Sequence, residues 1–302
     1  MIDILMATYN GGSYIENQIL SLIGQTYKDW RLLVHDDGSS DETVKIIKRY
    51  EKLDSRINLI EDNIKCGGAA QNFLHLLKHS NADYIVFCDQ DDIWMESKLE
   101  VLFNKIKNVN EPFAVYCNAY AYNGVKIIAD KVSLIERDNL ENSLFLNSGV
   151  QGCSLMFNKQ LLDLLRDYPD YIYMHDHYIT IGAVAFGKLC YIDESLMLYR
   201  QHDNNVTGNV PISIMDRIKT FTNRKNAIID FKHYDANKSF FEKYGLKLSN
   251  KDVNLFKAYL LFPNLNLLQK LSTIIKYNFK IGNSSLILLI KALFKNALNK
   301  NF

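Results

Sequence analysis

The sequence predicts an α/β protein with a doubly wound, mainly parallel sheet, helices on both of its faces and a helical C-terminal region. Over the first hundred residues, short apolar runs alternate with helical patterns, and acidic turns follow two of these runs. Such alternation is typical of parallel sheets, because each crossover helix returns the chain to the same end of the sheet.

Each element follows from a local pattern. Apolar runs between turn residues predict strands at 2–8, 30–35, 57–60, 84–88, 113–122 and 154–157, and one or two more within 188–200. Apolar residues at helical spacing predict helices at 15–23, 44–50, 69–79, 96–108 and 176–186. Ser13 with Glu16, and Ser39 with Glu42, have capping-box spacing and predict two helix starts.

The pattern changes near Pro211, where strand signals become few and Lys, Asn and Leu occur with helical spacing. A chain of 302 residues can form one large domain or two unequal ones. We therefore expect an α/β domain over 1–210 and a helical region over 211–302.

Composition narrows the class of protein. The chain is 48% hydrophobic and 23% charged, which is an ordinary globular balance, and its net charge of +1 indicates no nucleic-acid partner. Five cysteines without a CxxC pair predict reduced thiols in a cytoplasmic protein. The first residues lack the basic start of a signal peptide, and the late apolar run 286–290 is far below the roughly 20 residues that span a bilayer.

The stretch FCDQDDIW ends the fourth predicted strand with three carboxylates in four residues. Mg²⁺ and Mn²⁺ prefer oxygen ligands, and Asp89 and Asp91 can present two carboxylates at one turn. The alternative is a solvated loop in which Asp92 caps a helix that begins near Trp94. A second acidic pair, Asp36 and Asp37, ends the second strand and favours a site, since ligands bind at the carboxyl ends of such strands.

Three motifs in order, ATYNGGSYI, VHDDGSSDET and FCDQDDIW, resemble the successive signatures of family 2 glycosyltransferases, which are inverting enzymes with a GT-A fold. The later segments GVQGCSLMFN, MHDHY and LYRQHDNNVTG resemble the bacterial rhamnosyltransferase-like subgroup. The resemblance covers about residues 1–208, so the expected domain 1–210 would be the GT-A catalytic domain.

The resemblance implies a nucleotide-binding side. Thr8 and Tyr9 would contact the base and ribose, although Tyr9 can also be a half-buried aromatic at a strand end. Asp36 would accept a hydrogen bond from the pyrimidine ring N–H. Asp37 and Ser39 can instead support the turn.

It also implies a metal at the donor diphosphate, with Asp89 and Asp91 as the DXD-like element and Asp91 as the first choice of direct ligand. Mn²⁺ or Mg²⁺ would neutralise charge on the departing nucleotide. His202 could reach the metal or diphosphate, and Arg200 could pair with phosphate; the alternative is a polar strand exit. Relatives commonly carry glycine where this chain has Asp203.

The resemblance places the catalytic base at Asp176, in MHDHY, where a carboxylate would take the proton of the acceptor hydroxyl. The alternative for Asp176 is a helix N-cap. The residues assigned to acceptor binding are Asp92, Trp94, Gln151, Gly152 and His175.

The last 38 residues carry six lysines (270, 276, 280, 291, 295 and 300) and no acid. Apolar residues at helical spacing accompany them, as in a helix that lies on an anionic membrane. Packing on the catalytic domain, or on a second copy as a homo-oligomer, explains the pattern equally well. Membrane contact would be peripheral, on the inner face of the cell membrane.

Together these observations predict an inverting, metal-dependent glycosyltransferase. Its donor would be a nucleotide sugar, dTDP-rhamnose first and a UDP-hexose second, and its acceptor a saccharide or lipid-linked saccharide of a bacterial surface polysaccharide. The alternative is a non-catalytic subunit of a polysaccharide-synthesis complex that uses an acidic pocket for binding or assembly.

Overall fold

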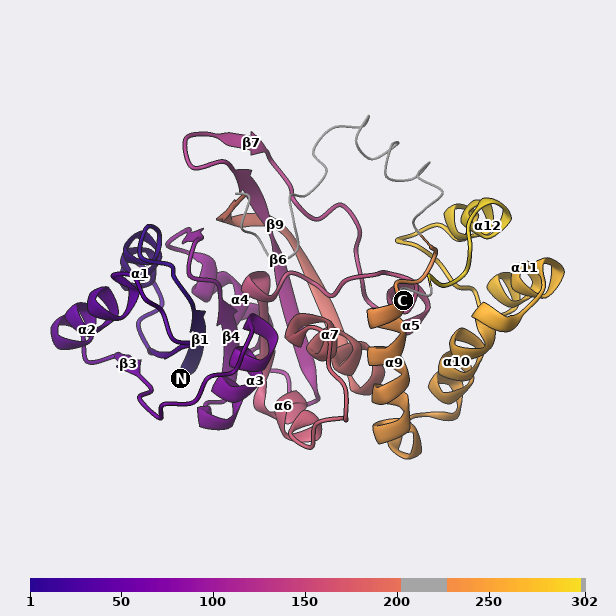
Figure 1. Ribbon diagram of the computed structural model, residues 1–302, viewed down its shortest axis with the longest axis horizontal. Coiled ribbons are helices and arrows are strands. Elements are labelled where there is room, and N and C mark those ends of the chain that lie inside the picture. The colour runs from indigo at the N-terminus through magenta and orange to yellow at the C-terminus, as the bar shows by residue number, and fades with distance from the viewer. Residues whose placement is uncertain (202–226, 300–302) are drawn as a thin grey trace. The chain divides into compact units, whose positions relative to one another are not determined.

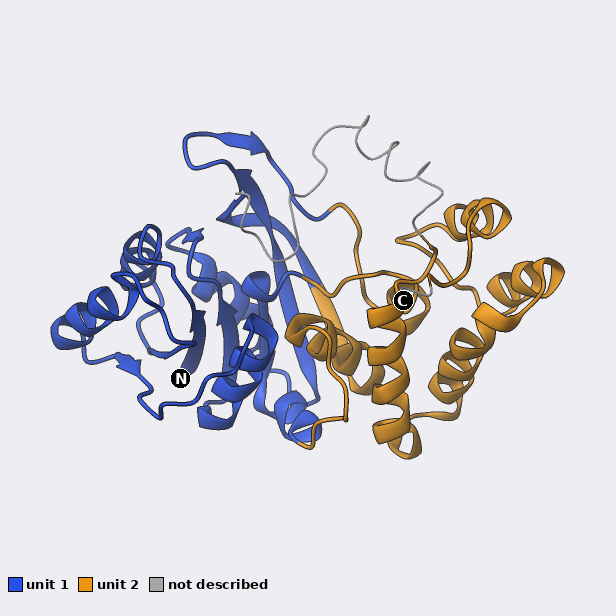
Figure 2. Ribbon diagram, in the orientation of Figure 1, with its two compact units in different colours: residues 1–133, 151–166, 191–210 blue, residues 134–150, 167–190, 211–302 orange. Residues whose placement is uncertain are grey.

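The computed structural model describes residues 1–201 and 227–299 (Figure 1). These residues form two compact units, coloured separately in Figure 2. Unit 1 comprises 1–133, 151–166 and the described part of 191–210; unit 2 comprises 134–150, 167–190 and the described part of 211–302. Segments 134–150 and 167–190, which the expected boundary at 210 assigns to the first domain, therefore belong to unit 2.

Unit 1 is built on a nine-stranded sheet of order β3-β2-β1-β4-β8-β6-β9-β5, with β7 beside β6. The strands are β1 (Ile2–Thr8), β2 (Trp30–Asp36), β3 (Ile57–Leu59), β4 (Tyr84–Cys88), β5 (Ile93–Trp94), β6 (Phe113–Tyr122), β7 (Ile127–Ala129), β8 (Leu155–Asn158) and β9 (Lys188–Arg200).

The strands β3, β2, β1 and β4 are parallel neighbours, whereas β8 joins β4 and β6 in antiparallel pairs. The apolar residues of β1 are buried on both faces, as expected for a central parallel strand. Register places Thr8 opposite Asp36 and Met6 opposite Cys88, so the carboxyl ends of β1, β2 and β4 meet at one edge.

Helices complete both units (Figure 1). Unit 1 contains α1 (Ile15–Ile23), α2 (Thr43–Leu53), α3 (Ala69–His79), α4 (Lys98–Ile106), α6 (Lys159–Leu165) and the 3₁₀ turn η1 (Gly152–Ser154). Unit 2 contains α5 (Leu140–Ser143), α7 (His175–Phe186), α9 (Phe231–Tyr244), α10 (Asn250–Leu261), α11 (Leu267–Lys276), α12 (Ser285–Phe294) and the 3₁₀ turns η2 (Gly245–Lys247) and η3 (Phe262–Asn264).

Unit 2 is held by aromatic packing. The buried ring of Phe145 lies 4.9–5.3 Å, between ring centroids, from those of Tyr259, Phe262 and Phe279, in edge-to-face geometry. The predicted α/β class with C-terminal helices is confirmed. In the described part of the chain, no helix combines the length and apolar character needed to cross a membrane.

The predicted capping boxes are wrong. Helix α1 begins at Ile15 and α2 at Thr43, and neither first turn is capped by Ser13 or Ser39. Instead, Asp41 accepts a 3.0 Å hydrogen bond from the Thr43 N–H, and Ser39 bonds to Asp36. The alternative of a helix starting near Trp94 is also wrong, because Ile93–Trp94 pairs with β9.

Candidate functional site

Two residues at the carboxyl ends of β1 and β2 are joined side chain to side chain. Thr8 is buried, and its hydroxyl donates to Oδ1 of Asp36 at 2.8 Å. Asp36 also accepts from the Ser39 hydroxyl at 2.6 Å and from the N–H groups of Ser39 and Gly38, at 2.7 and 3.1 Å. A base-binding role for Asp36 remains a prediction, and it requires one of these donors, such as the rotatable Ser39 hydroxyl, to move aside.

The neighbouring Asp37 holds the loop between β3 and α3. Its carboxylate accepts hydrogen bonds from the N–H groups of Cys66, Gly67 and Gly68, at 2.5, 3.2 and 3.0 Å. Its own N–H donates to the Thr8 carbonyl at 2.9 Å. Asp37 therefore supports the loop before α3, whereas the turn that follows β2 is held by Asp36.

Gln90 clamps the first motif to the acidic motif. Its side-chain oxygen accepts from the Tyr9 N–H and its amide nitrogen donates to the Tyr9 carbonyl, both at 3.0 Å. A Cβ on Gly11 would lie 2.1 Å from that oxygen, so a side chain at position 11 would displace the Gln90 amide from this clamp. The clamp fixes the Tyr9 backbone and leaves its side chain 58% exposed, open to a ligand.

The loops after β1 and β2 are also bonded to each other. The Asn10 N–H donates to Ser39 Oγ at 2.8 Å, and Asn10 Oδ1 accepts from the Ser40 N–H at 2.9 Å. The Gly12 N–H donates to Asp41 at 2.9 Å. Sequence reasoning missed Gln90, Asn10 and Asp41, because the partners of each lie about 30 to 80 residues away.

The acidic loop combines exposed and buried carboxylates. Ligand atoms of Asp89, Asp92 and Cys153 lie within 4.8 Å of one another. Asp92 is buried and accepts from the Arg200 N–H at 3.0 Å; burial first, and then Asp91 and Asp89, raises its pKa well above the ordinary value.

Burial likewise raises the pKa of the Cys153 thiol. Asp89 and Asp91 are half-exposed. Carboxylate oxygens at such a turn suit Mg²⁺ or Mn²⁺, and the residues therefore fit the divalent ion that the motif implies.

Arg200 fastens the acidic loop to the end of β9. Its Nε donates to the Asp91 carbonyl at 2.7 Å, and its guanidinium lies 5.0 Å from the ring centroids of both Tyr14 and Tyr122. Only 8% of Arg200 is exposed. Its phosphate contact remains a prediction, and His202 lies outside the described residues.

The predicted acceptor residues of unit 1 are mostly covered. Trp94 is 3% exposed, and Lys98 Nζ lies 3.4 Å from the centroid of its ring. Lys98 also donates to the Cys153 carbonyl, and burial lowers its pKa. Gln151 is half-exposed and Gly152 is buried at the start of η1, so the acceptor role of these residues remains a prediction.

The predicted base lies in unit 2, in the first turn of α7. Asp176 is half-exposed, and its Oδ1 accepts from the His177 N–H at 2.6 Å. The N-cap position belongs to Met174, so the N-cap alternative for Asp176 is wrong. His175 and His177 are buried, which lowers the pKa of each to about 3 and leaves both neutral at pH 7.

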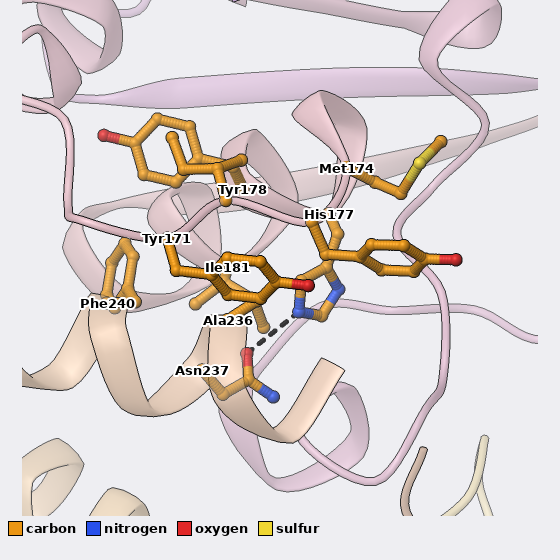
Figure 3. Close-up of a pocket in the computed structure, with 10 residues that line it drawn as sticks. Tyr171, Met174, His177, Tyr178, Ile181, Ala236, Asn237 and Phe240 are labelled. Atoms are coloured by element: carbon orange, nitrogen blue, oxygen red, sulfur yellow. Dashed lines mark hydrogen bonds between the residues drawn. The ribbon is translucent and has the colours of Figure 1, made fainter. Parts of the chain in front are cut away.

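Two contacts hold this turn in place. A Cβ on Gly149 would lie 2.5 Å from the His177 backbone nitrogen and 2.7 Å from the Asp176 carbonyl carbon, so only glycine fits there. Figure 3 shows His177 pointing toward Asn237 of α9, with a 2.9 Å hydrogen bond between them. No local sequence pattern points to Gly149, because its close contacts are with Asp176 and His177, which belong to another segment of the chain.

Solved structures share this arrangement of strands and helices. S. aureus TarS 1–349 in complex with UDP-GlcNAc matches with a TM-score of 0.58 and 14% identity, over 91% of this chain and 80% of that chain. A mannosyltransferase from Pyrobaculum calidifontis, PcManGT in complex with GDP-Man and Mn²⁺, matches with a TM-score of 0.57 and 15% identity, over 97% and 79%. At these identities the similarity establishes the fold, which is of the GT-A type.

Sequence comparison gives the family. The family model described as glycosyl transferase family 2 matches residues 3–166. The dTDP-rhamnosyl transferase RfbG of Shigella flexneri is 33% identical over 67% of this chain and 73% of that protein. The UDP-Glc:alpha-D-GlcNAc-diphosphoundecaprenol beta-1,3-glucosyltransferase WfgD of Escherichia coli is 30% identical over 69% and 80%. The chain therefore belongs to glycosyl transferase family 2, which confirms the resemblance and makes the protein a glycosyltransferase.

Proposed function

We propose that this protein is an inverting, metal-dependent transferase that moves a sugar from a nucleotide-sugar donor to a hydroxyl of a bacterial surface polysaccharide. The donor we expect first is dTDP-rhamnose, and a UDP-hexose second. The similarity to a dTDP-rhamnosyl transferase, to a glucosyltransferase named for an undecaprenol-linked acceptor and to a putative teichuronic acid glycosyltransferase of Bacillus subtilis supports this proposal.

The observation that carries the proposal is the bonded edge of unit 1. Gln90 joins the Tyr9 backbone to the acidic loop, while Thr8 joins the same strand end to Asp36. This edge offers a fixed, exposed aromatic beside two half-exposed carboxylates, Asp89 and Asp91. A nucleotide needs a flat surface for its base or ribose, and its diphosphate needs a cation.

Each residue then has a role in the transfer. Asp89 and Asp91 would hold Mn²⁺ or Mg²⁺, which neutralises charge on the departing nucleotide diphosphate. Arg200 keeps the acidic loop in place through its bond to the Asp91 carbonyl. Asp176 accepts the proton of the acceptor hydroxyl as that oxygen attacks the anomeric carbon, because the hydroxyl becomes acidic only as the new bond forms.

Calorimetric titration tests the donor site, with UDP and dTDP measured separately, each with and without Mn²⁺. We expect metal-dependent binding that weakens at least about tenfold in Asp91→Asn, because a ligand carboxylate is lost. Asp83→Asn is the matched control, because Asp83 is an exposed acid directly before the first residue of β4, whereas the acidic loop follows the last residue of that strand. If neither nucleotide binds under any condition, the proposed donors and the proposed metal dependence are overturned.

The C-terminal helices extend the proposal to the acceptor. In α11 and α12 the exposed apolar residues are Leu267, Leu268, Ile275, Leu286, Ile287, Leu293 and Phe294. Lysines 270, 276 and 291 lie on the same two helices. We propose that this basic, apolar surface contacts anionic lipid, where an undecaprenol-linked acceptor would be reached. Cosedimentation with anionic but not neutral vesicles is expected; a concentration-dependent dimer without vesicle binding would assign the surface to a second copy.

A further inference from the structure

Three histidines and one carboxylate of unit 1 converge beside the edge where β1 and β2 end; His35 lies within the VHDDGSSDET motif, whereas Asp62, His75 and His79 lie outside the three motifs. His35 comes from β2, Asp62 from the loop after β3, and His75 and His79 from adjacent turns of α3. Nε2 of His35 lies 3.2 Å from Asp62 Oδ1, and Nε2 of His75 lies 2.6 Å from Asp62 Oδ2. Nε2 of His79 lies 3.3 Å from Nε2 of His75 and 3.8 Å from Asp62 Oδ2.

These separations match those of ligands around one small metal ion. Tetrahedral zinc holds nitrogen at about 2.0–2.1 Å, which puts neighbouring ligand atoms about 3.3 Å apart. The observed values of 3.2, 3.3 and 3.8 Å bracket that spacing. The shorter 2.6 Å contact between His75 and Asp62 is a direct hydrogen bond, which a metal would replace. Ligand atoms of His35, Asp62 and His75 all lie within 4.8 Å of one another, and His79 joins this group through its contacts with His75 and Asp62.

Asn72 orients the most deeply buried ligand. Its Nδ2 donates to the His35 carbonyl at 3.1 Å, so its Oδ1 is the atom that lies 2.7 Å from His35 Nδ1. The amide oxygen must accept there, which places a proton on Nδ1 and directs Nε2 toward the cluster. Metal-bound histidines are commonly held by such a bond from the second ring nitrogen.

The exposure of the cluster also suits a cation. Exposure rises from 2% of the His35 side chain to 38% of the His79 side chain, which gives an ion a path from solvent.

We propose that His35, Asp62, His75 and His79 form a binding site for a divalent transition metal of the zinc type, separate from the Asp89–Asp91 site. Three imidazole nitrogens and one carboxylate are ligands that Zn²⁺ prefers, whereas Mg²⁺ and Ca²⁺ prefer oxygen alone. The site is structural: Asp62 begins the loop whose other end, Cys66 to Gly68, is held by Asp37.

The direct test is metal binding by the full chain. After removal of metal with a chelator, we expect one Zn²⁺ to bind per chain and to raise the melting temperature by roughly 5 °C at a hundred times Kd. Co²⁺ in its place should give the visible absorption of a four-coordinate ion. Protein that binds no zinc, or cobalt with only the weak bands of six coordination, overturns the proposal and leaves a His–Asp hydrogen-bond network.

Variants separate this site from other metal ligands. His75→Gln should abolish zinc binding, and Asn72→Ala should weaken it about 10–100-fold while every ligand stays in place. His233→Gln, which disrupts a His–Asp pair in unit 2, and Asp91→Asn should leave it unchanged. Equal zinc binding by His75→Gln, or its loss in Asp91→Asn, would place the ion elsewhere. If His75→Gln does not fold, Asn72→Ala and the cobalt spectrum of the native chain decide.

Discussion

The edge of unit 1 where β1, β2 and β4 end and the first turn of α7 in unit 2 hold their carboxylates by different means. The edge is a polar network in which Asp36, Gln90 and Asn10 each bond to a residue of a separate segment. The α7 turn instead rests on close backbone packing against Gly149 and on two buried, neutral histidines. A hydrogen-bond network can exchange one of its bonds for a bond to a ligand, whereas close backbone packing fixes the position of the Asp176 carboxylate.

The largest expected effect tests whether Asp176, the carboxylate of the packed turn, is the catalytic base. Asp176→Asn keeps the shape of the turn but removes the proton acceptor, so kcat should fall about 10³-fold, within the usual range for a general base. Nucleotide affinity and melting temperature should not change. Asp170→Asn, an exposed acid of the same unit, is the control. Retained kcat in Asp176→Asn would move the base elsewhere.

Gly149→Ala tests whether packing positions that carboxylate. The added Cβ would meet the backbone of Asp176 and His177 at 2.5–2.7 Å, and backbone atoms must then shift. We expect kcat to fall about 10²-fold, because small displacements of a catalytic group are costly. Gly24→Ala, whose Cβ would make ordinary contacts from 3.5 Å, should be silent. Equal activity of both variants would show that the turn adjusts freely.

The buried histidines of the turn predict a pH dependence of stability. Their folded pKa of about 3 lies below the unfolded value, so the unfolded chain binds more protons at acid pH. The free energy of unfolding should fall as pH drops from about 6.5 toward 3, by up to about 1.4 kcal/mol per pH unit for each histidine. Urea titrations at several pH values measure this slope, and His177→Gln should flatten it. An unchanged slope in the variant would contradict the assignment.

The smallest expected effect belongs to the polar network. Gln90→Ala removes two hydrogen bonds to the Tyr9 backbone, each contributing about 1 kcal/mol. We expect KM for the donor to rise about tenfold with kcat nearly unchanged, because the clamp shapes the binding edge and not the reacting groups. Steady-state kinetics with the donor varied give both constants. A fall in kcat alone would show that the clamp acts on chemistry.

The sequence predicts some features and not others for physical reasons. Strands such as β1 and β4 are continuous apolar runs, so each carries its own signal. The capping-box pattern of Ser39 and Glu42 misplaces the start of α2. The side chain that accepts a hydrogen bond from the Thr43 N–H is Asp41, which is not part of that pattern.

The same reasoning applies to the site. Its motif residues could be found from local spacing, but the clamp by Gln90 and the role of Gly149 depend on partners from distant segments. The histidine cluster left one local trace: His75 and His79 are four residues apart on a predicted helix, and so share a face.

His35, Asp36 and Asp37 are consecutive, yet each is bound to a different part of unit 1. His35 contacts Asn72 and Asp62, Asp36 closes its own turn, and Asp37 holds the loop before α3. A strand that slips by one residue exchanges its two faces, so a slipped β2 would lose all three sets of contacts together. All three sets of contacts therefore form only when β2 has the correct register, which favours cooperative, all-or-none assembly of the whole edge.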